Sequence, residues 1–276
     1  MAKLVCRFCN TVTPSVVISR LLLALFLACM VQIAGVAAAG NTATVWESTG
    51  LIRVDGNLAE WDRSSPIVLD NYNQLIRDLD FWEGLSDFSA NVYLMWDESN
   101  LYVGAEVTDD IPFVTVNRRV DEVDSMVLYF STNPGADPNR ESYESTDFMV
   151  ALAMVPGYFD TCIDRWMVED KKGIDSDGIW GGEQVLDGYE CAVREFGGGY
   201  TYTFEAKIPF SNFYNEWLPE FSPMRGTKIG FDVQMSDLDF TCPGWPIPQM
   251  AWVGTNEIME SPQGWATLKF DSKEEK

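Results

Sequence analysis

Residues 90–108, ANVYLMWDESNLYVGAEVT, decide the fold class of this chain. Apolar side chains occupy every second position in 90–96 and again in 101–107, and the turn residues DESN lie between the two runs. A period of two on both sides of a short polar turn is typical of two antiparallel strands that bury one face. The stretch therefore predicts a β-hairpin.

The same alternation recurs along the chain, with glycine and proline between the runs. Three glycines at 197–199 precede one such run, and Pro209 ends it because proline cannot donate to a strand ladder. Further strands are expected at 52–55, 125–130, 148–153, 184–193, 200–208, 229–236, 249–253 and 266–270. Helical periodicity is confined to short turns near 59–61 and 211–217. The sequence predicts an all-β fold, an antiparallel two-sheet β-sandwich of jelly-roll type with little helix.

The first 39 residues have the order of a secretory signal peptide. Basic residues come first, the apolar run 21–30 follows, and the small residues VAAAG stand at 36–40. We expect a signal peptide at 1–39, a single β-sandwich domain at 40–276, and a secreted, extracytoplasmic protein. The alternative is an uncleaved membrane anchor, since the apolar stretch 21–39 is just long enough to span a bilayer.

The composition excludes several classes of function. The chain has 42 acidic and 19 basic residues, a net charge of −23. Such a surface repels nucleic acid and anionic membranes, whereas divalent cations and neutral ligands remain suitable partners. The alternative is that the acids only solvate an extracellular protein. Because histidine is absent, Ser-His-Asp and Cys-His catalysis, the usual catalytic zinc sites and histidine-ligated haem are excluded.

Three cysteines remain after the leader, Cys162, Cys191 and Cys242. An oxidising compartment would give one disulfide and one spare thiol, with three pairings open. The pairing of Cys162 with Cys191 is favoured, because both belong to the same expected hairpin region.

Six segments stand out, in order: IRVDGNLAEW at 52–61, LMWDESNLYV at 94–103, DSMVLYF at 124–130, FEAKIPF at 204–210, IGFDVQMSD at 229–237 and GWATL at 264–268. Together they resemble the family-9 carbohydrate-binding modules. The resemblance covers about 51–270. It implies a β-sandwich with bound Ca²⁺ and a slot in which aromatic rings stack on a sugar while polar side chains bond its hydroxyls.

Only part of that slot is carried over to this sequence. Gln234 matches the family's glutamine, but Val127 and Met149 stand where the resemblance implies glutamate and arginine. The slot tryptophan has no counterpart in 120–123, VDEV. Apolar residues at these positions leave sugar hydroxyls unpaired at roughly 1–3 kcal/mol each. The ligand differs, binding has moved to the loops, or it is lost; outward apolar residues also predict that this face is covered.

Loop residues supply other candidates for sugar contacts. Trp245 lies between prolines in PGWP at 243–246, which stiffen its loop, and an exposed indole stacks on the C–H face of a sugar. Trp252 with Asn256 and Glu257 could add a ring and polar contacts. The alternative is that these aromatic residues cover the open ends of the sandwich and that 256–257 is an ordinary turn.

Closely spaced aspartates suggest a cation site. Asp109, Asp110, Asp237 and Asp239 offer the hard oxygen ligands that calcium prefers, as do Asp175 and Asp177. The resemblance favours Asp109 and Asp237. The alternative for each pair is a solvated turn.

These observations favour a secreted, non-catalytic carbohydrate-binding protein that contacts oligo- or polysaccharide and assists polysaccharide breakdown. A structural or interaction sandwich without a sugar ligand is the alternative. A haem-binding electron-transfer domain with Met and Lys ligands, and a hydrolase, rank lower. With 42 acids in the chain, a pair at glycosidase spacing would arise by chance, so the count gives no evidence for catalysis.

Overall fold

The computed structural model describes residues 41–113, 123–155, 160–167, 184–196, 201–213, 220–240, 244–253, 258–259 and 261–273. The chain divides into two units, 1–40 and 41–276, and the expected signal peptide at 1–39 lies outside the described residues. No helix within the described ranges is long and apolar enough to cross a membrane.

The described part of the second unit is built from strands and short 3₁₀ turns. The strands are β1 (Thr42–Glu47), β2 (Ile67–Leu69), β3 (Leu75–Arg77), β4 (Phe88–Trp96), β5 (Asn100–Asp109), β6 (Ser125–Ser131), β7 (Asp147–Val155), β8 (Asp160–Met167), β9 (Gln184–Val185), β10 (Glu190–Phe196), β11 (Thr201–Pro209), β12 (Lys228–Ser236), β13 (Gln249–Ala251) and β14 (Ala266–Asp271). The 3₁₀ turns are η1 (Leu58–Glu60), η2 (Tyr72–Gln74), η3 (Leu79–Phe81) and η5 (Phe210–Phe213).

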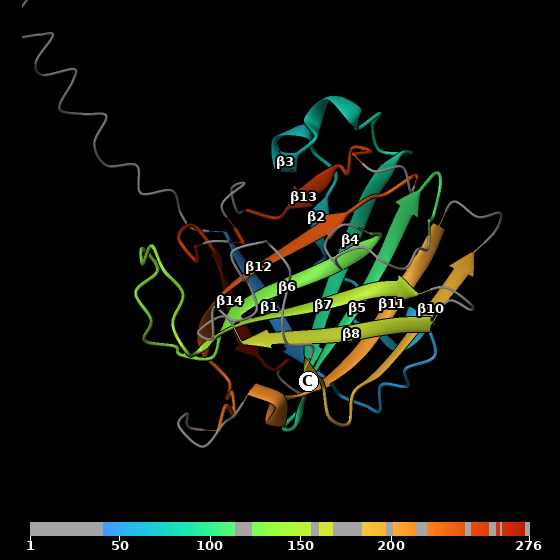
Figure 1. Cartoon of the computed structure of the whole chain (residues 1–276). Helices are drawn as coiled ribbons and strands as arrows, with labels where there is room; N and C mark the ends of the chain where they lie inside the picture. The colour runs from blue at the N-terminus through green and yellow to red at the C-terminus, as the bar shows by residue number, and fades with distance from the viewer. Residues whose placement is uncertain are drawn as a thin grey trace, which may run out of the picture. The chain divides into compact units, whose positions relative to one another are not determined.

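The strands form two packed layers. One contains the order β10-β11-β5-β4, and the other contains β12-β6-β7-β8-β9. In Figure 1, β6, β7 and β8 run across β4, β5 and β11. The layers are joined through β1, which pairs in parallel with both β4 and β14. The expected β-sandwich is confirmed, and the purely antiparallel sheet needs this one correction.

The core lies between the layers and explains the alternation in the sequence. Val92, Leu94, Val103 and Phe204 from one layer share a buried cluster with Leu128, Val150 and Val233 from the other. These are the positions of period two, so each strand turns every second side chain inward. The hairpin predicted at 90–108 is formed by β4 and β5, with Tyr93 opposite Gly104.

Two sequence-based strand assignments need correction. Residues 52–55 form no strand; Ile52 is instead buried with Leu58 and Trp61 against the outer side of β4 and β5. That side of the hairpin is therefore partly buried as well. The run expected at 184–193 is broken by a turn between β9 and β10, where Gly188 has φ +67°. β1, β2, β3 and β8 were not expected, because short or mixed-polarity strands carry little periodicity.

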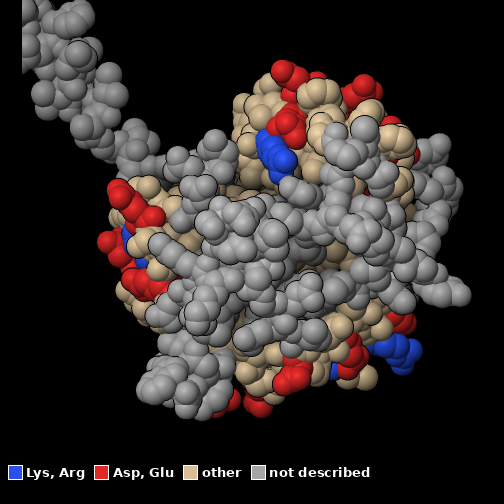
Figure 2. Space-filling model, in the orientation of Figure 1, with Lys and Arg blue, Asp and Glu red and all other residues tan. Residues whose placement is uncertain are grey.

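Acidic side chains lie around the rim of the face seen in Figure 2, and basic side chains are few there. This distribution agrees with the strongly negative net charge of the chain.

Candidate functional site

The face of β12, β6 and β7 around Gln234 is closed by the protein itself. Gln234 is 0% exposed, and its Oε1 accepts a hydrogen bond of 2.9 Å from the Tyr129 hydroxyl. Its Nε2 lies 3.4 Å from the Ser236 Oγ. The amide is thus bonded within the fold and is not accessible to a sugar.

A second apolar cluster covers this face. Val127 and Met149 are each 1% exposed and pack with Trp265, Ile258 and Tyr129, and Ile76, Tyr143 and Met259 pack on the edge. The Tyr143 hydroxyl donates to the carbonyl of Ile258, which fixes the covering segment. The covered face that the two apolar substitutions predict is present. Binding at this slot would require displacement of the protein's own side chains.

Six aspartates gather at one end of the sandwich, and we call them the aspartate cluster. They are Asp87, Asp109, Asp110, Asp124, Asp237 and Asp239. Register explains the meeting: Phe88 of β4 lies opposite Asp109 of β5, and Ser125 of β6 lies opposite Ser236 of β12. The β4–β5 layer therefore brings Asp87, Asp109 and Asp110 to this end, and the β6–β12 layer brings Asp124, Asp237 and Asp239. Four of the six aspartates suggested by the sequence, Asp109, Asp110, Asp237 and Asp239, belong to this cluster.

Asp87 and Asp124 were missed by sequence reasoning. Asp87 has no other acid within three residues, whereas Asp124 closely follows Asp121 and Glu122, so spacing does not single out its carboxylate. The segment DSMVLYF, used only to recognise the strand, contains Asp124 and was the available signal.

The cluster holds carboxylates that are buried without matching donors. Asp124 accepts backbone bonds from Phe113 and Leu238, of 2.5 and 2.7 Å. Asp237 is 1% exposed, and neither of its oxygens has a hydrogen-bond partner among the described residues. Asp109 Oδ2 and Asp239 Oδ1 are likewise buried and unpartnered there. Isolated buried carboxylates are costly unless a cation compensates them.

The electrostatics agree with that geometry. Burial raises the pKa of Asp237 to about 10, and the charges of Asp109 and Asp124 add to the rise. Burial also raises the pKa of Asp109 to about 7 and that of Asp239 to about 6. Neighbouring carboxylates cannot all ionise without a compensating charge.

The donor set fits a hard divalent cation. Three groups of three carboxylates each place one oxygen per residue within 4.8 Å of one another. Calcium takes six to eight oxygen ligands and prefers carboxylates, so the unpartnered oxygens of Asp109, Asp237 and Asp239 suit it.

An exposed aromatic pair follows the cluster in the chain. Phe240 and Trp245 are 51% and 42% exposed, and their ring centroids lie 5.3 Å apart at an interplanar angle of 62°. The described residues on either side of the pair are held, because Leu238 and Ile247 are buried in one cluster. The Ile247 N–H donates to Asp78 Oδ2 at 2.7 Å. The pair thus presents two rings on an anchored loop beside Asp239.

Of the remaining sequence-based candidates, the structure describes some and not others. Trp252 is half-buried and packs on the main core beside Phe231, with ring centroids 6.4 Å apart. Asn256 and Glu257 lie outside the described residues, as do Asp175 and Asp177. The side chains of Cys162 and Cys242 are not described either, so the pairing with Cys191 stays a prediction.

Comparison with known proteins places residues 54–269 within the family described as carbohydrate family 9 binding domain-like. Among solved structures, a family-9 module from Caldicellulosiruptor kristjanssonii in complex with cellotriose is 18% identical, with a TM-score of 0.56 over 85% of this chain and 96% of that one. A family-9 module from the same organism in complex with glucose is also 18% identical, with a TM-score of 0.55 over 86% of this chain and 98% of that one.

A putative carbohydrate-binding protein from Bacteroides uniformis is 10% identical, with a TM-score of 0.51 over 84% of this chain and 100% of that one. No curated protein matches the sequence. At these identities the structural matches support the shared fold.

Proposed function

The chain belongs to the carbohydrate family 9 binding domain-like family, and from that premise we propose that it is a secreted, non-catalytic carbohydrate-binding protein. We propose that its oligo- or polysaccharide contacts the aromatic pair Phe240 and Trp245. Two exposed rings on an anchored loop carry this proposal. Exposed aromatic faces bind the apolar C–H face of a sugar, and neighbouring polar groups orient it.

Calcium belongs to the same proposal. Asp109, Asp237 and Asp239, with Asp87, Asp110 and Asp124 around them, would hold the ion. The ion would compensate their charge and thereby fix the base of the loop that carries Phe240. The chain's own residues then position the rings and contact the sugar.

Titration calorimetry of the purified protein with calcium present tests the proposal. The ligands are glucose and cellotriose, which two similar structures contain, with a panel of other soluble oligosaccharides. Trp245→Ala should weaken binding about tenfold, because loss of a stacked ring removes roughly 1.4 kcal/mol. Tyr72→Ala is the matched control, since Tyr72 is a 52% exposed aromatic outside this loop. Equal affinity in Trp245→Ala, Phe240→Ala and the unchanged protein would contradict the aromatic pair as the site.

A second candidate function is a structural or interaction sandwich without a sugar ligand. The buried amide of Gln234 favours it, because the face that the family resemblance assigns to sugar is closed. If the folded protein binds none of the oligosaccharides in the panel, that result would favour this second function.

Secretion and a role beside polysaccharide-degrading enzymes are proposals that rest on the order of residues in 1–39 and on the family. The intact mass of the exported protein tests the first. A mass that still includes residues 1–39 would contradict cleavage.

A further inference from the structure

A cavity of about 560 Å³ lies on the outer face of β4, β5 and β11, away from the sandwich core. Strand register places polar side chains in two rows across this face. One row is Ser89, Thr108 and Thr201, and the other is Asn91, Glu106 and Thr203. These side chains alternate with the core-facing positions, so the strands that bury the core also make a polar floor.

Other side chains bound this polar face on two sides. Leu58 and Trp61 cover the next row, where a Cβ on Gly104 would lie 3.1 Å from Leu58 Cδ2 and 3.2 Å from the Trp61 ring. This covering stops at Leu58 and Arg63, which line the cavity, and Val68 and Leu85 line it from the other side. The result is a bounded hollow in the size range of ligand pockets.

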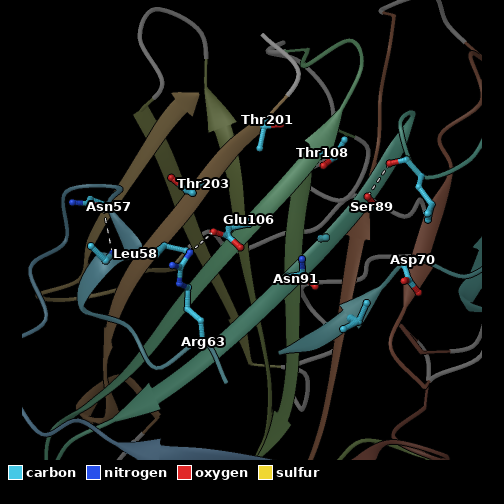
Figure 3. Close-up of a pocket in the computed structure, with 14 residues that line it drawn as sticks. Asn57, Leu58, Arg63, Asp70, Ser89, Asn91, Glu106, Thr108, Thr201 and Thr203 are labelled. Carbon is cyan, nitrogen blue, oxygen red and sulfur yellow. Dashed lines mark hydrogen bonds and ion pairs between the residues drawn. The ribbon is translucent and has the colours of Figure 1, made fainter. Parts of the chain in front are cut away.

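The polar groups that line the hollow converge on its floor. Arg63 Nη1 lies 2.7 Å from Glu106 Oε1, and the Tyr93 hydroxyl donates to Glu106 Oε2 at 2.7 Å. The Arg63 and Glu106 side chains remain 49% and 34% exposed. Figure 3 shows Asn91 on the strand beside Glu106. Its half-buried side-chain amide makes no hydrogen bond among the described residues.

This chemistry matches a neutral sugar unit. A guanidinium donates to vicinal hydroxyl oxygens while a carboxylate accepts from the same hydroxyls, and an amide does both. Glu106 and Asp70 outweigh Arg63, so an anion is disfavoured. The apolar parts of Leu58, Val68 and Leu85 suit the C–H groups of a ring.

We propose that this cavity is a second carbohydrate-binding site, specific for a neutral hexose or pentose unit and separate from Phe240 and Trp245. Arg63, Asn91 and Glu106 bond the hydroxyls. None of the described residues that line the cavity is aromatic, so hydrogen bonds rather than stacking select the sugar. The site goes beyond the proposed function because it uses the opposite layer of the sandwich.

Residues of the cavity and of the aspartate cluster are close neighbours in the sequence. Thr108 precedes Asp109, and Leu85 is two residues before Asp87. Removal of calcium would therefore disturb both places, so the test keeps calcium constant and varies single residues.

The experiment is a titration of the protein with glucose, galactose, mannose and xylose, followed by calorimetry and by ¹H–¹⁵N spectra. We expect the Asn91 side-chain amide signal to shift saturably. Glu106→Gln and Asn91→Ala should each weaken this binding roughly tenfold, as expected for a lost hydrogen bond to a charged or buried group. Trp245→Ala should leave the saturable shift of the Asn91 signal unchanged, although it weakens binding at the aromatic pair.

Glu190→Gln is the matched control. It removes an acid paired with Lys207 on β11 that does not line the cavity. Thermal unfolding of every variant establishes that it is folded. An unmoved Asn91 signal, or equal affinity in Glu106→Gln and Glu190→Gln, would overturn the second site. Loss of all binding in Trp245→Ala would also overturn the second site, and it would support the aromatic pair as the binding site. Loss of binding only in the cavity variants would contradict the aromatic pair instead.

Discussion

Single residues determine which face of this sandwich is open. Val127 and Met149 are apolar where the family resemblance implies charged groups, and both are buried under Trp265 and Ile258. Gln234 keeps its identity but bonds Tyr129 and Ser236. A residue that matches the family resemblance can therefore hold the fold together at a position where the resemblance implies ligand contact.

Gln234→Ala tests this interpretation. The change removes hydrogen bonds between fully buried groups, so the free energy of unfolding should fall by about 1–3 kcal/mol. Sugar affinity should not change. Urea unfolding measures the first quantity and calorimetry the second. A folded Gln234→Ala variant that no longer binds any sugar would show that Gln234 belongs to the binding site.

The sequence predicted the cluster's close-spaced aspartates but not the whole cluster. Asp109 with Asp110, and Asp237 with Asp239, stand out because two acids lie within three residues. Asp87 and Asp124 join them only through the register of β4 with β5 and of β6 with β12. Spacing along a chain cannot show contacts that depend on strand pairing.

At the scale of elements, the segment 51–63 shows how a strand-like pattern can form a cover. The alternation in 52–55 predicts a strand, but Glu205 of β11 holds the segment outside the sheet. Glu205 accepts bonds from the N–H groups of Asp55 and Gly56, of 2.8 and 2.7 Å, and from Trp61 Nε1 at 2.8 Å. Three donors on one buried carboxylate replace the ladder of a strand. A sequence pattern does not identify such a distant acceptor.

Glu205→Ala should therefore destabilise the protein strongly. Three donors lose their acceptor, and two of these three hydrogen bonds are buried. Each donor left unsatisfied in the interior costs about 1–3 kcal/mol. We expect a loss of at least about 2 kcal/mol in unfolding free energy, measured by urea denaturation. Glu190→Ala, on the exposed end of an ion pair on the neighbouring strand, should change it by less than about 1 kcal/mol. Similar losses in the two variants would show that Glu205 does not anchor the segment.

At the scale of the whole molecule, the period-two runs were sufficient to predict two packed layers. They could not predict that β1 closes the arrangement by parallel pairing with β4 and β14. Thr42–Glu47 is a short strand of mixed polarity, and its place depends on edges that β4 and β14 leave open. Local alternation indicates which side of a strand is buried, whereas the order of strands depends on all of them together.

The molecule also buries carboxyl groups that cannot all ionise without a compensating charge, and this gives the last prediction. Asp237 is buried with unpartnered oxygens beside Asp109 and Asp124, so the fold without a cation bears a cost that calcium would remove. Calcium at one hundred times its dissociation constant should add about 2.7 kcal/mol of stability. Thermal unfolding in calcium and in EDTA measures the difference. Asp237→Asn should unfold at a higher temperature than the unchanged protein in EDTA and should lose the response to calcium, whereas Glu98→Gln, on an exposed turn, should keep it. An equal calcium response in Asp237→Asn would show that the ion binds elsewhere. No response in the unchanged protein would remove calcium from the proposed function, and the aromatic pair would then be tested on its own.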